Sequence, residues 1–220
     1  MNSVILNKSY KELPFCDKEI LRYAGCNEAD GETVKLLRSC IDEIKGDLTY
    51  KVCYCKLSVK TEGNICHFGA FSVESKNLAV NLKNCENVIL FASTVGIGID
   101  RLITRYGRIS PSKALMLQAI GAERIEALCD AFCADIGKEY NIATKPRFSP
   151  GYGDLPITTQ KDIFNILSPE KRIGLTLTDS MLMSPSKSVT AIVGLGGNVN
   201  TTKNKCSTCN KKDCNFRSTL

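Results

Sequence analysis

Hydrophobic residues recur every three or four positions along the longest patterned stretch of the chain, residues 110–141, which is the period of an α-helix. Ser110 and Pro111 mark its start, because serine favours the N-cap and proline favours the first helical position. A helix of roughly 30 residues at 1.5 Å per residue is about 45 Å long, so it is expected to organise the domain. Shorter helices are predicted over residues 17–28, 30–46, 75–85, 99–107 and 158–168.

Residues 48–60 follow a different pattern, in which successive side chains alternate between the two sides of an extended chain. This predicts a strand, and the turn after it makes residues 65–73 the expected hairpin partner. Cys53, Cys55 and Cys66 on these strands are expected to act as small apolar fillers of the sheet. Further strands are predicted over residues 86–96, 172–178 and 187–195.

These elements predict an α+β fold, with a mostly antiparallel, twisted sheet packed against one long helix. We expect one domain over residues 1–202, with an N-terminal α+β part (1–85) and a part that carries the motifs (86–202). Residues 203–220 form a separate tail. Gly96-Ile97-Gly98 lies between a strand and a helix, but the third glycine of the dinucleotide fingerprint is missing, so that ligand is not favoured.

Cysteine content and charge distinguish the tail from the rest of the chain. The sequence has 12 cysteines and a net charge of +6. The tail holds five basic residues against one acidic residue, so the body is nearly neutral and a nucleic-acid partner is not indicated. No secretory leader or long apolar stretch is recognisable. We therefore expect a cytoplasmic protein with reduced thiols and no membrane partner.

Three cysteines of the tail, Cys206, Cys209 and Cys214, have a spacing that suits metal binding. Zinc or an iron–sulfur centre is the favoured interpretation, and the alternatives are redox-active or free thiols and cysteines with no role. A four-coordinate site needs one more ligand. The candidates are Cys66, Cys85, His67 and a second chain, although His67 is more simply a half-buried strand residue.

A loop rich in proline and glycine, residues 147–156, joins the long helix to the later strands. Arg147 at its start can hold a carboxylate with two hydrogen bonds, and Tyr152 offers a ring face and a hydroxyl group. This chemistry suits a small anionic or zwitterionic ligand, and the alternative is a rigid connection.

Two acidic residues, Glu126 and Asp130, lie four positions apart on one face of the long helix. Like charges at this spacing repel each other by a few tenths of a kcal/mol, roughly, so helix stability does not explain them. Such a pair can hold a metal ion, an imidazolium or another cation. An ordinary solvated acidic face is the alternative.

Two segments in this order resemble a known family. Residues 147–156, RFSPGYGDLP, are similar to the Arg…Pro-Gly-Tyr…Pro signature of the activation domain of cobalamin-dependent methionine synthase. Residues 174–194, with Thr178-Asp179-Ser180, resemble a second segment of that family. The resemblance covers residues 86–194 well and implies a stand-alone activation domain. Such a domain binds S-adenosylmethionine while inert cob(II)alamin is reduced and methylated.

The resemblance also implies roles for individual residues. Arg147 would pair with the carboxylate of S-adenosylmethionine, and Glu126 and Asp130 would hold the histidine of a corrinoid module after it leaves cobalt. The loop would contribute contacts from Ser149, Gly151 and Tyr152. An N-terminal acidic residue of the family has no secure counterpart here, and a tyrosine of the family falls at Val193.

Further partners follow from the same resemblance. Cobalamin would be presented by a corrinoid-binding module of methionine synthase, and the electron would come from a flavodoxin-like or ferredoxin-like donor. The methyl donor and cobalt carry the bond chemistry, which leaves open whether the chain is itself an enzyme. The alternative function is a metal-binding adaptor whose cysteine tail docks a redox or nucleic-acid partner.

Overall fold

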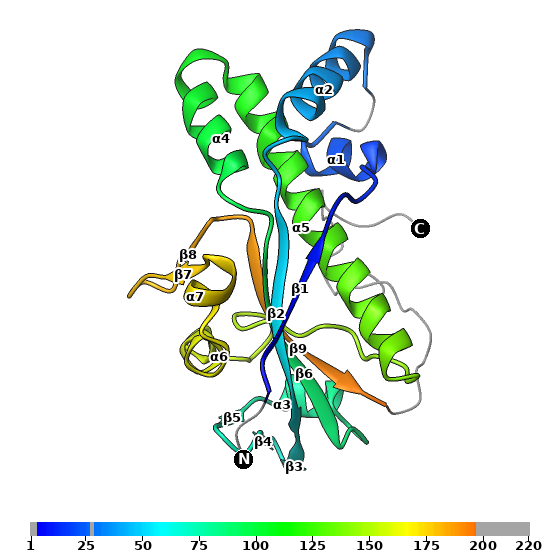
Figure 1. Ribbon diagram of the computed structural model, residues 1–220, viewed down its shortest axis with the longest axis vertical. Helices are drawn as coiled ribbons and strands as arrows, with labels where there is room; N and C mark the ends of the chain where they lie inside the picture. Colours follow the sequence, from blue (N-terminus) through cyan, green and yellow to red (C-terminus); the bar gives the residue numbers. More distant parts are fainter. Residues whose placement is uncertain (1–3, 27–28, 197–220) are drawn as a thin grey trace.

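A four-stranded antiparallel sheet forms the centre of the protein in a computed structural model that describes residues 4–26 and 29–196 (Figure 1). Its strand order is β1-β2-β6-β9, and every neighbouring pair is antiparallel. This confirms the predicted α+β class. The strands are β1 (Leu6–Tyr10), β2 (Tyr50–Ser58), β6 (Asn87–Thr94) and β9 (Ser188–Leu195).

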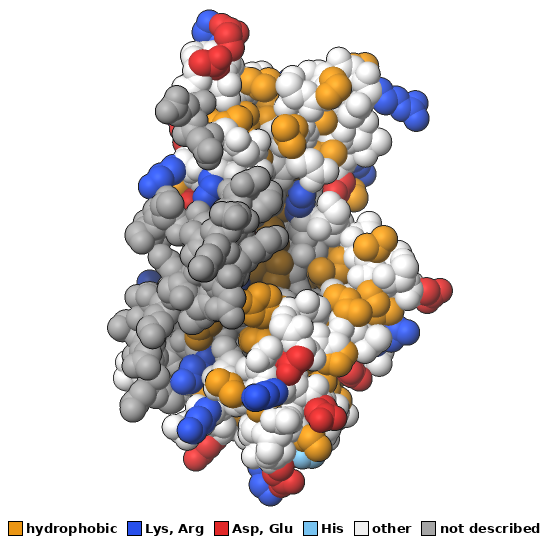
Figure 2. Space-filling model, turned by 180° about the vertical axis from the view of Figure 1, so that it is seen from behind, with side chains coloured by type: hydrophobic (Ala, Val, Ile, Leu, Met, Phe, Trp, Pro, Cys, Tyr) orange, Lys and Arg blue, Asp and Glu red, His pale blue; other side chains and the backbone are white. Residues whose placement is uncertain are grey.

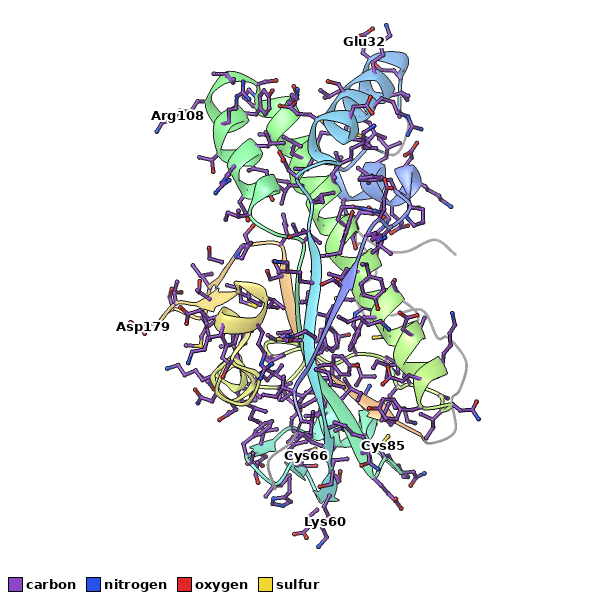
Figure 3. All side chains as sticks on the ribbon, in the orientation of Figure 1. Glu32, Lys60, Cys66, Cys85, Arg108 and Asp179 are labelled. Carbon is purple, nitrogen blue, oxygen red and sulfur yellow. The ribbon has the colours of Figure 1, made fainter. Side chains whose placement is uncertain are left out.

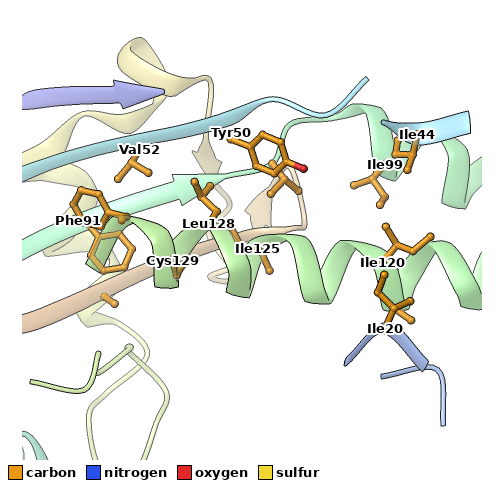
Figure 4. Close-up of a cluster of buried hydrophobic side chains, with 14 of the residues drawn as sticks. Ile20, Ile44, Tyr50, Val52, Phe91, Ile99, Ile120, Ile125, Leu128 and Cys129 are labelled. Atoms are coloured by element: carbon orange, nitrogen blue, oxygen red, sulfur yellow. The ribbon is translucent and has the colours of Figure 1, made fainter. Parts of the chain in front are cut away.

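The long helix α5 (Pro111–Glu139) crosses one face of this sheet, and its 29 residues confirm the predicted helix. Figure 1 shows α1, α2 and α4 gathered around its N-terminal half. Figure 4 shows Leu128 of α5 pointing towards the strands that carry Val52 and Phe91. The buried side chains between these helices and this face of the sheet form the first hydrophobic core. The neighbouring helices are α1 (Asp17–Tyr23), α2 (Gly31–Ile44) and α4 (Gly98–Ile109).

A second hydrophobic core lies on the opposite face of the sheet. Alternation along β2 explains both cores, because Val52 and Tyr54 belong to the first and Cys53 and Cys55 to the second. The elements over this face include α3 (Lys76–Asn81), α6 (Thr159–Leu167), α7 (Pro169–Ile173) and the short strands β3 (Lys60–Glu62), β4 (Ile65–His67), β5 (Ser72–Glu74), β7 (Thr176–Leu177) and β8 (Met183–Ser184).

One predicted strand pairing and one predicted strand are wrong. Residues 65–73 do not pair with β2, whose partners are β1 and β6; they form a small separate sheet with β3 instead. The predicted strand 172–178 begins as helix α7, since Pro169 suits the first helical position and Gly174 ends the helix in the left-handed conformation. Strand β1 was not predicted, and the predicted helix 17–28 ends at Tyr23.

The cysteines of the described body behave mostly as core residues. Cys53, Cys55 and Cys66 are fully buried, which confirms their role as apolar fillers, and all nine described cysteines are free thiols. Figure 3 shows Cys66 and Cys85 at the end of the molecule where β3, β4 and β5 lie. His67 is half-buried in β4, and its Nδ1 lies 2.8 Å from the Ser72 hydroxyl.

The surface carries both signs of charge. Over the described residues in Figure 2, Lys and Arg side chains are interspersed with Asp and Glu and with hydrophobic side chains. Within residues 4–26 and 29–196, no helix combines the length and apolar character needed to cross a bilayer.

Candidate functional site

A cavity of about 590 Å³ lies between α5, α1 and the extended segment that follows α5. This volume is in the range typical of small-molecule sites, about 300–1,000 Å³. It brings Arg147 together with Glu126 and Asp130, three residues that the sequence singled out. The described residues that line it are Leu13, Pro14, Cys16, Glu19, Arg22, Tyr23, Glu123, Glu126, Ala127, Asp130, Ala131 and Arg147.

Arg147 is positioned by the edge of the sheet. Residues 143–148 run beside β9, where Phe148 and Ile192 exchange two backbone hydrogen bonds of 2.9 Å. Side chains alternate along an extended segment. Phe148 therefore enters the second core, and Arg147 turns to the other side and meets α5.

Arg147 forms ion pairs with both acids of α5. Its Nη2 donates to Glu126 Oε2 at 2.5 Å, and its Nη1 donates to Asp130 Oδ1. Only 11% of the Arg147 side chain is exposed, against 37% for Glu126 and 72% for Asp130. One mostly buried cation thus joins two carboxylates at the edge of the cavity.

The charge of Arg147 is strongly favoured despite burial. Desolvation lowers the pKa of the guanidinium, but the neighbouring Cys129, Asp130 and Glu126 raise that pKa by more, so it lies above its ordinary value. Cys129 lies beneath them in the core, where burial raises the pKa of its thiol to about 12. Arg147 is therefore a permanent cation, and Cys129 is a neutral thiol at neutral pH.

One wall of the cavity is the segment before α1, and a buried ion pair on α5 holds it in place. Arg124 is fully buried and donates to the carbonyl oxygens of Leu13 at 2.7 Å and Pro14 at 2.6 Å. Glu123 pairs with Arg124 and accepts a hydrogen bond from the backbone amide of Cys16 at 3.3 Å. Residues far apart in sequence therefore share one wall.

Helix α1 supplies the remaining wall. Arg22 pairs with Glu19 at 2.7 Å, and burial, followed by the nearby Glu126 carboxylate, raises the pKa of Tyr23. Sequence reasoning did not assign these residues to the site. The only local signal is the spacing of Glu19 and Arg22, which is common on solvated helices, so tertiary contact alone identifies them.

The three loop residues proposed from the sequence, Ser149, Gly151 and Tyr152, are not among the described residues that line this cavity. Ser149 is two residues after Arg147 and shares its side of the extended segment by alternation. Gly151 has φ of +85°, and its amide donates to Leu155 O at 2.9 Å. Tyr152 is 58% exposed, and its ring packs edge-on against that of Phe148, with ring centroids 5.3 Å apart.

A family model described as vitamin B12 dependent methionine synthase, activation domain, matches residues 78–213. The chain belongs to this family. The match extends beyond residues 86–194, where the sequence resemblance is clear, and it takes in Cys206 and Cys209.

The crystal structure of the MetH reactivation domain bound to AdoHcy has the same fold as the chain. The TM-score is 0.66 and the identity 14%, and the likeness covers 87% of this chain and 78% of that one. At this identity the likeness is one of fold. No curated protein matches the chain.

Val193 and the predicted metal ligands remain to be compared with the structure. Val193, where the family pattern has a tyrosine, is 1% exposed and pairs with Ile89 in the first core; it is not among the described residues that line the cavity. Within the described residues, no group of three or more metal-ligating side chains occurs. The predicted metal ligands Cys206, Cys209 and Cys214 lie outside the described residues.

Proposed function

We propose that the chain binds S-adenosylmethionine in the cavity beside α5 and supports the reductive methylation of cob(II)alamin. The cobalamin would be carried by the corrinoid module of a separate methionine synthase or a related corrinoid methyltransferase. Membership of the activation-domain family and the fold shared with a domain bound to AdoHcy support this role.

One observation carries the proposal: a mostly buried, permanently charged Arg147 lines a cavity of small-molecule size. Its guanidinium can hold the ligand's carboxylate with two parallel hydrogen bonds. From there the ligand would extend around the edge segment towards Ser149, Gly151 and Tyr152. When bound, S-adenosylmethionine supplies the methyl group, and the residues of the chain bind and orient it.

Glu126 and Asp130 are proposed to contact the corrinoid module. Asp130 is 72% exposed, so a cationic group of another protein, such as an imidazolium, can reach it. A flavodoxin-like or ferredoxin-like protein is the proposed electron donor, which follows from the reaction class.

Calorimetry with S-adenosylmethionine tests the binding role. Arg147→Ala should weaken binding by about 1.5–3 kcal/mol, because a charge-assisted hydrogen-bonding partner is lost. Arg108→Ala is the matched control, since Arg108 is exposed at the far end of α4 (Figure 3). If wild-type protein does not bind S-adenosylmethionine, the proposed function is wrong.

Metal binding by Cys206, Cys209 and Cys214 stays a separate proposal, supported by their spacing alone. If the tail instead docks a redox or nucleic-acid partner as an adaptor, deleting it abolishes partner binding. Anaerobic purification with a visible spectrum and metal analysis tests the metal itself. A colourless, metal-free protein would rule out both the zinc and the iron–sulfur interpretation.

A further inference from the structure

The ion pairs of Arg147 join the proposed ligand-binding residue to the two acids proposed to bind the partner protein. Arg147 is the proposed anchor of the ligand's carboxylate, yet its two terminal nitrogens donate to Glu126 and Asp130. These acids are the groups proposed to receive a cation from the partner. We propose that Glu126 and Asp130 compete with the ligand's carboxylate for Arg147, so that ligand binding makes both acids available to a cationic partner group. This inference rests on the proposed function and adds its regulation.

The charges around Arg147 favour such competition. One guanidinium and two carboxylates carry a net charge of −1, and the carboxylate of a ligand brings it to −2. Nη2 already donates to Glu126, and a guanidinium grips a carboxylate with two of its N–H groups. An incoming carboxylate therefore meets negative charge at close range. Water and salt screen the charge of Glu126, 37% exposed, less than that of Asp130, 72% exposed.

Other cations of the cavity are already paired and are poor substitutes for Arg147. Arg22 pairs with Glu19 at 2.7 Å, and Arg124 is fully buried against Glu123 and the backbone of residues 13–14. Asp130 is 72% exposed. When Arg147 donates its hydrogen bonds to a ligand instead of to Asp130, a cation from another protein can reach the Asp130 carboxylate without a movement of α5.

The coupling has a definite sign. A ligand carboxylate favours the arrangement in which Arg147 leaves the acids, and a partner cation favours the same arrangement. Two binders that favour one arrangement must strengthen each other, and the factor is the same in both directions. The chain would thus bind a corrinoid module most tightly when its methyl donor is in place.

The first test measures binding of AdoHcy to the full chain by calorimetry. We expect the Glu126→Gln/Asp130→Asn double variant to bind AdoHcy about fivefold or more tightly than wild type, since the competing charges are gone. Glu139→Gln is the matched control: it removes one carboxylate from the exposed end of the same helix. Its affinity should match that of wild type. Asp130→Asn alone changes an exposed side chain and should give part of the gain.

The other outcomes show whether the inference alone or also the proposed function is wrong. Equal affinity in wild type and double variant shows no competition. Weaker binding in the double variant shows that the acids hold the ligand's amino group instead. Either result overturns the inference while the proposed function stands. If neither protein binds AdoHcy, the proposed function fails, and the inference fails with it.

The second test follows the partner. Saturating AdoHcy should raise the affinity of wild type for a corrinoid module of methionine synthase about fivefold or more. The same addition should leave the affinity of the double variant unchanged. An increase that persists in the double variant, or none in wild type, overturns the inference.

Discussion

Arg124 is a fully buried cation, and its surroundings explain how the chain tolerates it. It pairs with Glu123, donates to two backbone carbonyl oxygens and lies over the Phe15 ring, 4.0 Å from the ring centroid. Buried charges are tolerated when they are paired and hydrogen-bonded. Through these contacts one side chain of α5 fixes the segment that forms a wall of the cavity.

We expect Arg124→Met to lower the free energy of unfolding by about 3–5 kcal/mol, because Glu123 is left buried without its partner. Replacing both residues, as in Glu123→Leu/Arg124→Met, should recover at least half of that loss. Urea denaturation followed by circular dichroism measures both variants. A double variant no more stable than the single one would show that the backbone contacts of Arg124, rather than its charge pairing, dominate.

Asp154 connects the loop after Arg147 to helix α3. Its carboxylate accepts hydrogen bonds from the Ser75 hydroxyl and from the backbone amide of Lys76 at 2.9 Å. The Ser75 hydroxyl, followed by the amides of Asn77 and Lys76, lowers the pKa of Asp154 below its ordinary value. The charged form of this carboxylate is therefore the one that stabilises the fold.

This shift predicts a pH dependence. A carboxyl whose pKa is lower in the folded state adds stability above its unfolded pKa, about 3.9, and loses it as the pH falls further. Asp154→Asn should therefore be less stable than wild type at pH 7, and the difference should shrink at pH 3. Urea denaturation at both pH values measures it. A difference that is the same at both pH values would mean that the charge of Asp154 is not involved.

At the scale of the elements, the turn from β6 to α4 contains Gly96-Ile97-Gly98, a pattern that resembles part of a dinucleotide-binding motif. A Cβ atom added to Gly98 would lie 2.6 Å from the backbone oxygen of Asp47. This glycine lets the start of α4 pass close to the α2–β2 connection. Packing explains the Gly96-Ile97-Gly98 pattern without a nucleotide.

Gly98→Ala should therefore lower the free energy of unfolding by about 1–3 kcal/mol, because backbone atoms must move to admit the methyl group. Gly107→Ala is the matched control on the same helix, where an added Cβ meets nothing within 4 Å. That change should stabilise the protein by about 0.4–1 kcal/mol. Thermal unfolding of both variants measures the contrast, and equal effects would contradict the packing explanation.

Prediction from sequence worked where the pattern of an element is local. The stripe of α5 and the alternation of β2 both follow from spacing, and the structure confirms both. The prediction of strand pairing failed, because β2 pairs with β1 and β6 rather than with residues 65–73, the next predicted strand in the sequence. Strand β1 was missed since three of its five residues, LNKSY, are polar or charged and Leu6 is exposed, so the sequence shows no apolar side.

At the scale of the whole molecule, both hydrophobic cores and the cavity-lining residues that the structure describes lie within residues 4–196. The last strand of the sheet ends at Leu195. We therefore propose that residues 1–202 form the domain and that residues 203–220 are a separate part.

Deleting residues 203–220 should leave the free energy of unfolding and the affinity for AdoHcy unchanged within about twofold, because the two cores and the cavity lining that the structure describes come from residues before 197. Any bound metal should be lost. Calorimetry, denaturation and metal analysis of the truncated and full-length proteins test this. A truncated protein that fails to bind AdoHcy while the full chain binds it would place the tail within the site.

The sequence by itself determined the long helix, the alternation of β2 and the family, and it selected Arg147, Glu126 and Asp130 as candidate site residues. These depend on local spacing and on motifs that a single chain displays. Only the tertiary structure decided that Arg147 is held by both acids and that residues 13–23 close the cavity. The physical reason is that residues 143–148 reach α5 only because they run beside β9, at the edge of the sheet. Strand order depends on contacts between residues far apart in sequence, and the local spacing of hydrophobic residues does not predict it.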